Sequence, residues 1–200
     1  MKKVYKGEFG YISYRKKVGM IRTGIFLFLV LVTFIIGLIS FGSQKNVLSI
    51  VAALLCLPTG WSAVNMIMFI KYSSCTEKDY EKIEKHKGDL FMQYDHIITS
   101  YEKNYKVCAS TVLDKNICCY TDDKDYDLAD CEKHIMKMMA QNGYGSYSIK
   151  IFDNIDKFCE RLEGLEKLRA EKGIDPKTIE DAWVPGTTQT PAGVLLSISL

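Results

Sequence analysis

The feature that most constrains this chain is its uncharged stretch "TGIFLFLVLVTFIIGLISFG", Thr23 to Gly42. No charged residue occurs between Arg22 and Lys45, a run of about 22 positions, and a helix of that length measures roughly 33 Å. The hydrocarbon layer of a bilayer is about 30 Å thick. A second uncharged run extends from Asn46 to Ile70 for about 25 positions, which is again long enough to cross. We therefore predict a two-helix transmembrane hairpin, with spans at about 23–43 and 47–70.

Two other interpretations of the first run are weaker. A signal peptide has an apolar core of about 7–15 residues and a small-residue cleavage site, whereas this run is longer, lacks such a site and is followed by a second run. A buried hairpin of a soluble protein would be apolar on one face of each helix, and both runs are apolar on every face.

Charged residues near the runs predict the orientation. Before the first span stand seven cations, Lys2, Lys3, Lys6, Arg15, Lys16, Lys17 and Arg22, against the single acid Glu8. The connecting loop "SQKN" has only Lys45. Because cationic flanks stay in the cytoplasm, we expect an inner (plasma) membrane protein with both termini cytoplasmic. The chain then divides into a basic and aromatic flank at 1–22, the hairpin at 23–70 and a cytoplasmic domain at 71–200.

The second run carries small residues at helical spacing. They fall three or four positions apart and comprise Ser49, Ala52, Cys56, Gly60 and Ala63. Such a stripe lets helix backbones approach closely in lipid, either within the hairpin or between copies of the chain. Trp61 lies too centrally in this run to anchor it at a membrane interface, and Tyr72 is better placed for that role.

From Lys71 onward the pattern predicts a cytoplasmic α/β (α+β) domain with a mixed sheet. A helix is expected from the capping pair Ser74 and Glu77 to Gly88. The elements expected after it are strands at 94–103, 106–113 and 116–121, a helix at 128–142, a strand at 147–152, a helix from 155 to Gly173, a short helix within 175–183, a loop at 184–193 and a final strand at 194–200. The helix at 128–142 should bury Leu128, Cys131, Ile135 and Met138.

Few residues are arranged for chemistry. Cys131 and His134 lie three apart on one predicted helix, and a metal would need Cys118 or Cys119 to complete its ligands, so we expect neither a metal nor another cofactor. The seven cysteines form no paired framework, as suits reduced thiols in the cytoplasm. No phosphate-binding loop, dinucleotide fingerprint or nucleophile elbow occurs. Because positive and negative charges nearly balance, we do not expect nucleic acid as a partner.

One pattern does point to an enzyme. Asp122-Asp123-Lys124 gives D-x-K where the third predicted strand ends. With the order helix, three strands, helix, strand, the domain resembles the restriction-endonuclease-like core. That resemblance implies a catalytic Asp122 and Lys124 with a bound Mg²⁺, but the expected acid at the start of the second strand is missing, and Glu102 is the nearest substitute. The resemblance covers at most 76–152 and is compatible with a non-catalytic version of the fold.

The stretches "YKGEFGYISYRKK", "VAALLCLP" and "YDHIITSYEK" also resemble those of small, uncharacterised bacterial two-span proteins, a resemblance that implies no activity. We therefore interpret the chain as a membrane protein whose cytoplasmic domain binds a protein partner, as an adaptor or sensor, and is not catalytic. The alternatives are a membrane-tethered endonuclease-like enzyme and an oligomeric effector that permeabilises the bilayer through self-association.

Overall fold

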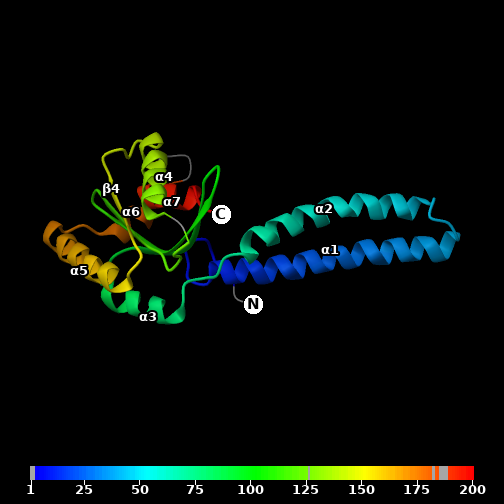
Figure 1. Cartoon of the computed structure of the whole chain (residues 1–200), viewed down its shortest axis with the longest axis horizontal. Helices are drawn as coiled ribbons and strands as arrows, with labels where there is room; N and C mark the ends of the chain where they lie inside the picture. The colour runs from blue at the N-terminus through cyan, green and yellow to red at the C-terminus, as the bar shows by residue number, and fades with distance from the viewer. Residues whose placement is uncertain (1–2, 126, 182, 185–188) are drawn as a thin grey trace. The chain divides into compact units, whose positions relative to one another are not determined.

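The computed structural model of the chain describes residues 3–125, 127–181, 183–184 and 189–200. These residues form two compact units (Figure 1). One unit is a helical hairpin, Ile12–Ser73, and the other, here called the α+β domain, combines Met1–Tyr11 with Ser74–Leu200. The segment before the hairpin and the segment after it thus belong to the same domain.

The hairpin consists of α1, Tyr11–Phe41, and α2, Val47–Ile70, both long and apolar enough to cross a membrane. Only 6% and 11% of their most apolar windows are buried within the structure, far less than in the core helix of a soluble protein. The predicted span 47–70 coincides with α2, whereas the predicted span 23–43 extends past the end of α1 at Phe41, and α1 begins well before Thr23. Asn46 caps α2, because its side-chain oxygen accepts a hydrogen bond from the backbone N–H of Ser49 at 2.8 Å.

The two helices of the hairpin pack along a regular seam. Among the buried and half-buried positions of α2, six are spaced three and four apart along one face: Ala52, Leu55, Thr59, Ser62, Met66 and Phe69. This spacing is typical of helix pairs that wind around each other with a left-handed twist. Gly37 lets the helices approach closely at the loop end, since a Cβ there would lie 2.8 Å from Asn46 Oδ1.

The α+β domain is built on a four-stranded mixed sheet, which confirms the predicted class. Its strands are β1, Met92–Thr99, β2, Asn104–Leu113, β3, Asn116–Tyr120, and β4, Ser148–Phe152, in the order β1-β2-β3-β4. β1, β2 and β3 pair antiparallel, whereas β4 is parallel to β3. The connection between β3 and β4 contains α4, Leu128–Gln141, as a parallel crossover requires.

Helices cover both faces of this sheet (Figure 1). α3, Glu77–His86, and α5, Ile155–Lys172, contribute to one buried cluster that includes Ile83, Phe158 and Leu162. α4 and α7, Pro191–Ser197, contribute to a second cluster with Ile135, Met139 and Val194. The short α6, Pro176–Asp181, follows α5 as the sequence predicts.

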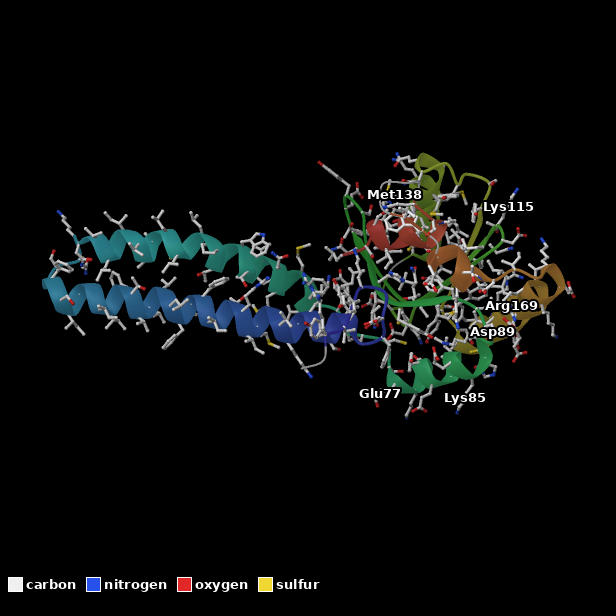
Figure 2. All side chains as sticks on the ribbon, turned by 180° about the vertical axis from the view of Figure 1, so that it is seen from behind. Glu77, Lys85, Asp89, Lys115, Met138 and Arg169 are labelled. Atoms are coloured by element: carbon white, nitrogen blue, oxygen red, sulfur yellow. The ribbon has the colours of Figure 1, made fainter. Side chains whose placement is uncertain are left out.

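The loop after α3 fits closely against α5. Gly88 has φ 54°, and a Cβ there would lie 2.6 Å from the side chain of Glu166. Arg169 then bridges Glu166 at 2.7 Å and Asp89 at 3.0 Å, and Figure 2 shows Arg169 and Asp89 next to each other. Glycine is required here because both its backbone angle and the lack of space exclude a side chain.

The predicted final strand at 194–200 is wrong. Thr190 caps a helix there, since its hydroxyl accepts a hydrogen bond from Gly193 N–H at 3.0 Å, and Pro191 occupies the first turn. Cap-plus-proline is a strong helix start, and it outweighs the β-branched residues that follow. Only Ser199 forms a bridge, to Ile98. Of the predicted loop at 184–193, positions 185–188 lie outside the described residues.

Two helix details also differ from prediction. Thr76, and not Ser74, caps α3, since its hydroxyl accepts a hydrogen bond from Asp79 N–H at 3.2 Å. In α4, Met139 is fully buried, while the predicted Met138 is only half-buried, because the buried stripe runs four positions on from Ile135.

The N-terminal segment, residues 3–10, is part of the α+β domain. Gly7 forms an antiparallel bridge with Tyr94 of β1, and its carbonyl accepts a hydrogen bond from Tyr94 N–H at 2.8 Å. Lys6 Nζ donates to the carbonyl of Ser199 at 2.6 Å. The two ends of the chain therefore cover the outer edge of β1, an edge that would otherwise expose unpaired backbone groups.

Candidate functional site

The predicted catalytic residue Asp122 lies just beyond the end of β3, in contact with β2. Its carboxylate oxygens are 2.7 and 2.8 Å from Lys106 Nζ, and one of them accepts a hydrogen bond from Cys108 Sγ at 3.0 Å. The Lys106 side chain is only 6% exposed and that of Asp122 26%. We call Lys106, Cys108 and Asp122 the polar cluster of the sheet.

Strand register brings these three residues together. Lys106 and Cys108 are two apart on β2, and the pairing of Ala109 with Tyr120 sets the residues after β3 beside them. Thr121 fixes the strand end, because its hydroxyl donates to the carbonyl of Lys106 at 2.8 Å. The Asp122 carboxylate is thus held against the strand that carries its partners.

In the polar cluster, the charges of Lys106 and Asp122 balance each other as an ion pair. Burial alone would lower the pKa of Lys106, but its neighbours, among them the hydrogen-bonded carboxylate of Asp122, outweigh burial, and the pKa is raised. A hydrogen bond with Cys75 and burial both raise the pKa of Cys108. Lys106 therefore stays an ammonium and Cys108 a thiol, which is a poor nucleophile and a poor metal ligand.

The other two predicted catalytic residues do not join the polar cluster. Lys124 is exposed in the segment after β3, and Glu102 is exposed in the turn between β1 and β2. Neither has a hydrogen bond or ion pair with Asp122 among the described residues. Within those residues no three His, Cys, Asp or Glu side chains lie close enough to hold a metal ion. The arrangement therefore neutralises Asp122 instead of presenting it to Mg²⁺.

The candidate metal ligands on α4 have structural partners. Cys131 is fully buried in the core, and His134 Nε2 lies 3.0 Å from the carbonyl of Thr99. Cys118 and Cys119 are buried on β3, and burial raises the pKa of both thiols. The described contacts give these residues packing roles.

A second buried site lies on β1, beside the polar cluster. Asp95 is 2% exposed and has φ 56°, a left-handed angle that is rare for a residue other than glycine. Its carboxylate accepts a hydrogen bond from the backbone N–H of Cys75 at 2.9 Å. Cys75 comes directly before the cap of α3, so Asp95 fixes the start of the chain segment that follows the hairpin.

The segments on both sides of the hairpin therefore attach to neighbouring residues of one strand. Gly7, which precedes α1, bonds Tyr94, and Cys75, which follows α2, bonds Asp95. Nothing in the sequence pattern indicated this arrangement. The only usable signal was the aspartate itself, because an acid in a strand that is otherwise largely apolar needs a buried donor.

The predicted small-residue stripe on α2 does not follow the helix seam. Ser49 is half-buried and Ala52 is buried, whereas Cys56 and Gly60 are exposed, and a Cβ on Gly60 would meet no atom within 4 Å. Ala63 is half-buried. The middle of the stripe thus lies off the seam, because Cys56 and Gly60 each stand one position after a seam residue, Leu55 and Thr59, and are therefore turned about 100° around α2 from it.

Comparisons with known proteins identify no relative of this chain. No protein-family model, curated protein or solved structure matches the chain.

Proposed function

We propose that the chain is an integral protein of the inner membrane that crosses the bilayer twice, with its α+β domain in the cytoplasm. The length and exposure of α1 and α2 support the two spans. The contrast between seven cations before the first span and the single Lys45 in the loop supports the orientation.

The observation that carries this proposal is the shared domain at the two ends of the hairpin. Residues 3–10 and the chain from Cys75 onward form one folded unit, joined at Tyr94 and Asp95. A chain that leaves a folded domain and returns to it must cross the bilayer an even number of times. Two spans are therefore consistent with the fold, and one span is not.

We further propose that the α+β domain binds a protein partner and does not catalyse a reaction. Asp122 is engaged in an ion pair with Lys106, so its carboxylate is not presented to a metal ion. None of the 24 Asp and Glu residues, and only six of the 26 Lys and Arg residues, lie between Ile12 and Ser73, so the rest of the chain is net negative. A net negative domain repels the phosphate backbone of nucleic acid, which argues against a nuclease.

The attachment at β1 favours a sensor or an adaptor. A change in how α1 and α2 pack would act on both connections, and these meet at consecutive residues of a strand that continues into the sheet. This attachment supports a role in which the domain reports the state of the hairpin to a bound partner.

Cysteine labelling in intact cells tests the orientation. In a Cys56→Ser background, Ser43→Cys places a thiol in the loop between the spans, and Tyr101→Cys places one at a fully exposed turn of the domain. A membrane-impermeant maleimide should label Ser43→Cys in intact cells and Tyr101→Cys only after permeabilisation. The reverse pattern would overturn the orientation, and recovery of the chain in the soluble fraction would overturn the membrane assignment.

A crosslinked pull-down tests partner binding. The full chain, crosslinked in cells and purified in detergent, should bring down one defined protein in stoichiometric amount. A chain that repeatedly yields only itself would count against the adaptor and favour self-association.

The endonuclease-like enzyme remains the second candidate, and its supporting observation is the strand order. The resemblance rests on the order helix, three strands, helix, strand, and the described elements follow that order in α3, β1, β2, β3, α4 and β4. Full chain incubated with supercoiled plasmid and Mg²⁺ or Mn²⁺ should leave the plasmid intact. Nicking that is lost in Asp122→Ala and retained in Asp125→Ala would replace the binding proposal with this one.

A further inference from the structure

The cytoplasm-facing end of the hairpin has an unusual charge composition. Five cations stand at this end, Arg15, Lys16, Lys17, Arg22 and Lys71, and not one Asp or Glu lies anywhere between Ile12 and Ser73. Arg22 is the last of the cations before the long uncharged run. Any anion that balances Arg22 must therefore come from outside the hairpin sequence.

Contacts with α2 hold the Arg22 side chain in place. Arg22 Nε donates to Ser62 Oγ at 2.9 Å, and Ser62 is fully buried. The hydroxyl of Thr23 lies 2.9 Å from the same oxygen. The guanidinium carbon is 4.8 Å from the centre of the Trp61 ring, a cation–π contact. One edge of the guanidinium is thus fixed against the helix seam.

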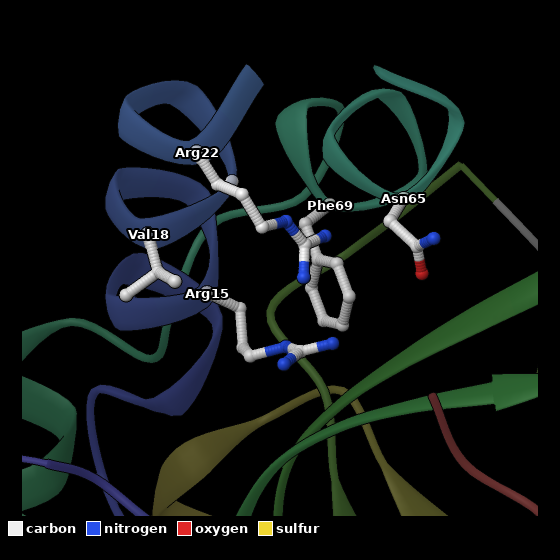
Figure 3. A pocket seen from close by; sticks show the side chains of 6 residues that line it. Arg15, Val18, Arg22, Asn65 and Phe69 are labelled. Atoms are coloured by element: carbon white, nitrogen blue, oxygen red, sulfur yellow. The ribbon is translucent and has the colours of Figure 1, made fainter. Parts of the chain in front are cut away.

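The other edge of the guanidinium is available to a ligand. Within the described part of the chain, the two terminal NH₂ groups of Arg22 have no hydrogen-bond acceptor. They present a planar fork of the kind that binds phosphate oxygens in pairs. Figure 3 shows the guanidinium groups of Arg15 and Arg22 reaching toward the same side of the hairpin, near Phe69.

A small cavity lies beside these groups. It is lined by Arg15, Val18, Gly19, Arg22, Asn65 and Phe69, and its volume of about 10 Å³ is room for one water-sized group. Asn65 Nδ2 donates to the carbonyl of Trp61 at 2.8 Å, which fixes the amide at the cavity wall. The cavity accommodates a single oxygen of a larger group that lies outside it.

Trp61 marks the part of the hairpin surface on which this site opens. Its side chain is 62% exposed, and the Arg22 guanidinium lies over its ring. A lipid that reaches the outer edge of the guanidinium therefore also lies against Trp61.

We propose that Arg22, positioned by Ser62 and Trp61, binds the phosphate of an anionic phospholipid. This inference rests on the proposed insertion of the hairpin in the membrane. The hairpin offers no carboxylate to the ammonium group of a zwitterionic lipid, and the five cations at this end favour a lipid of net negative charge. Phosphatidylglycerol is the simplest lipid of that chemistry.

Quenching of Trp61 fluorescence by brominated lipids tests this site. Trp183→Phe leaves Trp61 as the only tryptophan of the full chain, which is then reconstituted in vesicles of phosphatidylcholine with a minority of phosphatidylglycerol. In one set of vesicles only phosphatidylcholine is brominated, and in the other set only phosphatidylglycerol is brominated. Per molecule of brominated lipid, quenching should be about fivefold stronger for phosphatidylglycerol, which corresponds to about 1 kcal/mol.

Variants distinguish a specific lipid site at Arg22 from a general electrostatic attraction between anionic lipid and the chain. Arg22→Gln should make the two lipids quench equally, whereas Lys45→Gln, which removes one cation from the loop, should leave the preference unchanged. Arg22→Lys keeps the charge but loses the planar fork, so its preference should fall. If Arg22→Gln loses its helical circular dichroism signal, the result for Arg22→Lys decides whether the site exists. A helical Arg22→Lys chain with an unchanged preference for phosphatidylglycerol would overturn the site.

The remaining outcomes distinguish this inference from the function on which it rests. Equal quenching by both lipids in the parent chain would overturn the lipid site and leave the membrane assignment standing. No quenching by either lipid would overturn both. Added glycerol 1-phosphate should not change the quenching, and relief of the phosphatidylglycerol preference by it would mean that the site takes free phosphate instead of lipid.

Discussion

Phe9 and Tyr80 stack face to face, with ring centroids 4.1 Å apart and planes inclined by 18°. Phe9 belongs to the segment before α1, and Tyr80 to the first helix after α2. Tyr94 of β1 meets both rings edge-on, at 6.4 and 5.1 Å, and its hydroxyl donates to Glu84 at 2.6 Å. This aromatic group therefore joins the segments on both sides of the hairpin to the sheet.

Phe9→Ala should destabilise the α+β domain by about 2 kcal/mol, because it removes a half-buried ring together with its stacking contact. The measurement is urea unfolding of the full chain in detergent, followed by Trp183 fluorescence in a Trp61→Phe background. Tyr5→Ala is the matched control, since Tyr5 lies in the same segment but its side chain is 59% exposed. Equal effects of the two changes would mean that the segment does not contribute to the stability of the domain.

Lys106→Met should cost about 3 kcal/mol or more of unfolding free energy, since it leaves the Asp122 carboxylate beside the core without its ammonium partner. A second change, Asp122→Leu, should recover a large part of that loss, because it removes the stranded charge. Both are read from urea unfolding at neutral pH. Should Lys106→Met prove neutral, Asp122 would be solvated and available, and the endonuclease-like interpretation would gain support.

Element types were largely predictable from the sequence, because they depend on local patterns. The helical stripe from Ile155 ends where Gly173, at φ 62°, closes α5. Asp127 caps α4 as predicted, with its carboxylate accepting a hydrogen bond from Ala129 N–H at 2.8 Å. The final element, α7, differs from the predicted strand because Thr190 and Pro191 start a helix within the predicted loop.

The contacts that define the sites were not predictable, because they join residues far apart in the chain. Lys106 could be recognised as a polar residue within a strand, but its pairing with Asp122 depends on the register between β2 and β3. The left-handed angle of Asp95 was not predictable, because aspartate adopts this conformation more often than most residues but still in only a small share of its positions. Arg22 was counted only as a topology signal, and its contact with Trp61 depends on how the two helices pack.

His96 should make the stability of the domain depend on pH. Its ring is buried, with Nε2 3.0 Å from the hydroxyl of Ser110, and burial, with a contribution from Lys6, lowers its pKa to about 4. The unfolded chain binds the proton near pH 6.5 and the folded chain only near pH 4. Stability should therefore be complete above about pH 6.5 and fall by about 3 kcal/mol as the pH drops to 4.

The control for this pH dependence is His96→Gln, which keeps a polar group near Ser110 but cannot take up a proton. Urea midpoints of parent and variant should differ by a constant amount above pH 6.5, and the difference should shrink as the pH falls. Carboxylates titrate in the same acidic range in both chains, so their effect cancels. Parallel curves from pH 7.5 to 4.5 would show that His96 is not the group responsible.

Copies of the chain should associate through the face of α2 that carries Cys56 and Gly60. Cys56 is exposed, whereas the other described cysteines are buried, so mild oxidation of membranes should give a disulfide-linked dimer through Cys56. Gly60→Leu should reduce that dimer several-fold, because the small residue that allows close approach of the helices is lost. Gly24→Leu makes the same change at an open position on α1 and should leave the dimer intact. A parent chain that stays monomeric would assign this face to lipid and leave the α+β domain as the site of partner binding, whereas a dimer that survives Gly60→Leu would show that close approach at Gly60 does not hold the copies together.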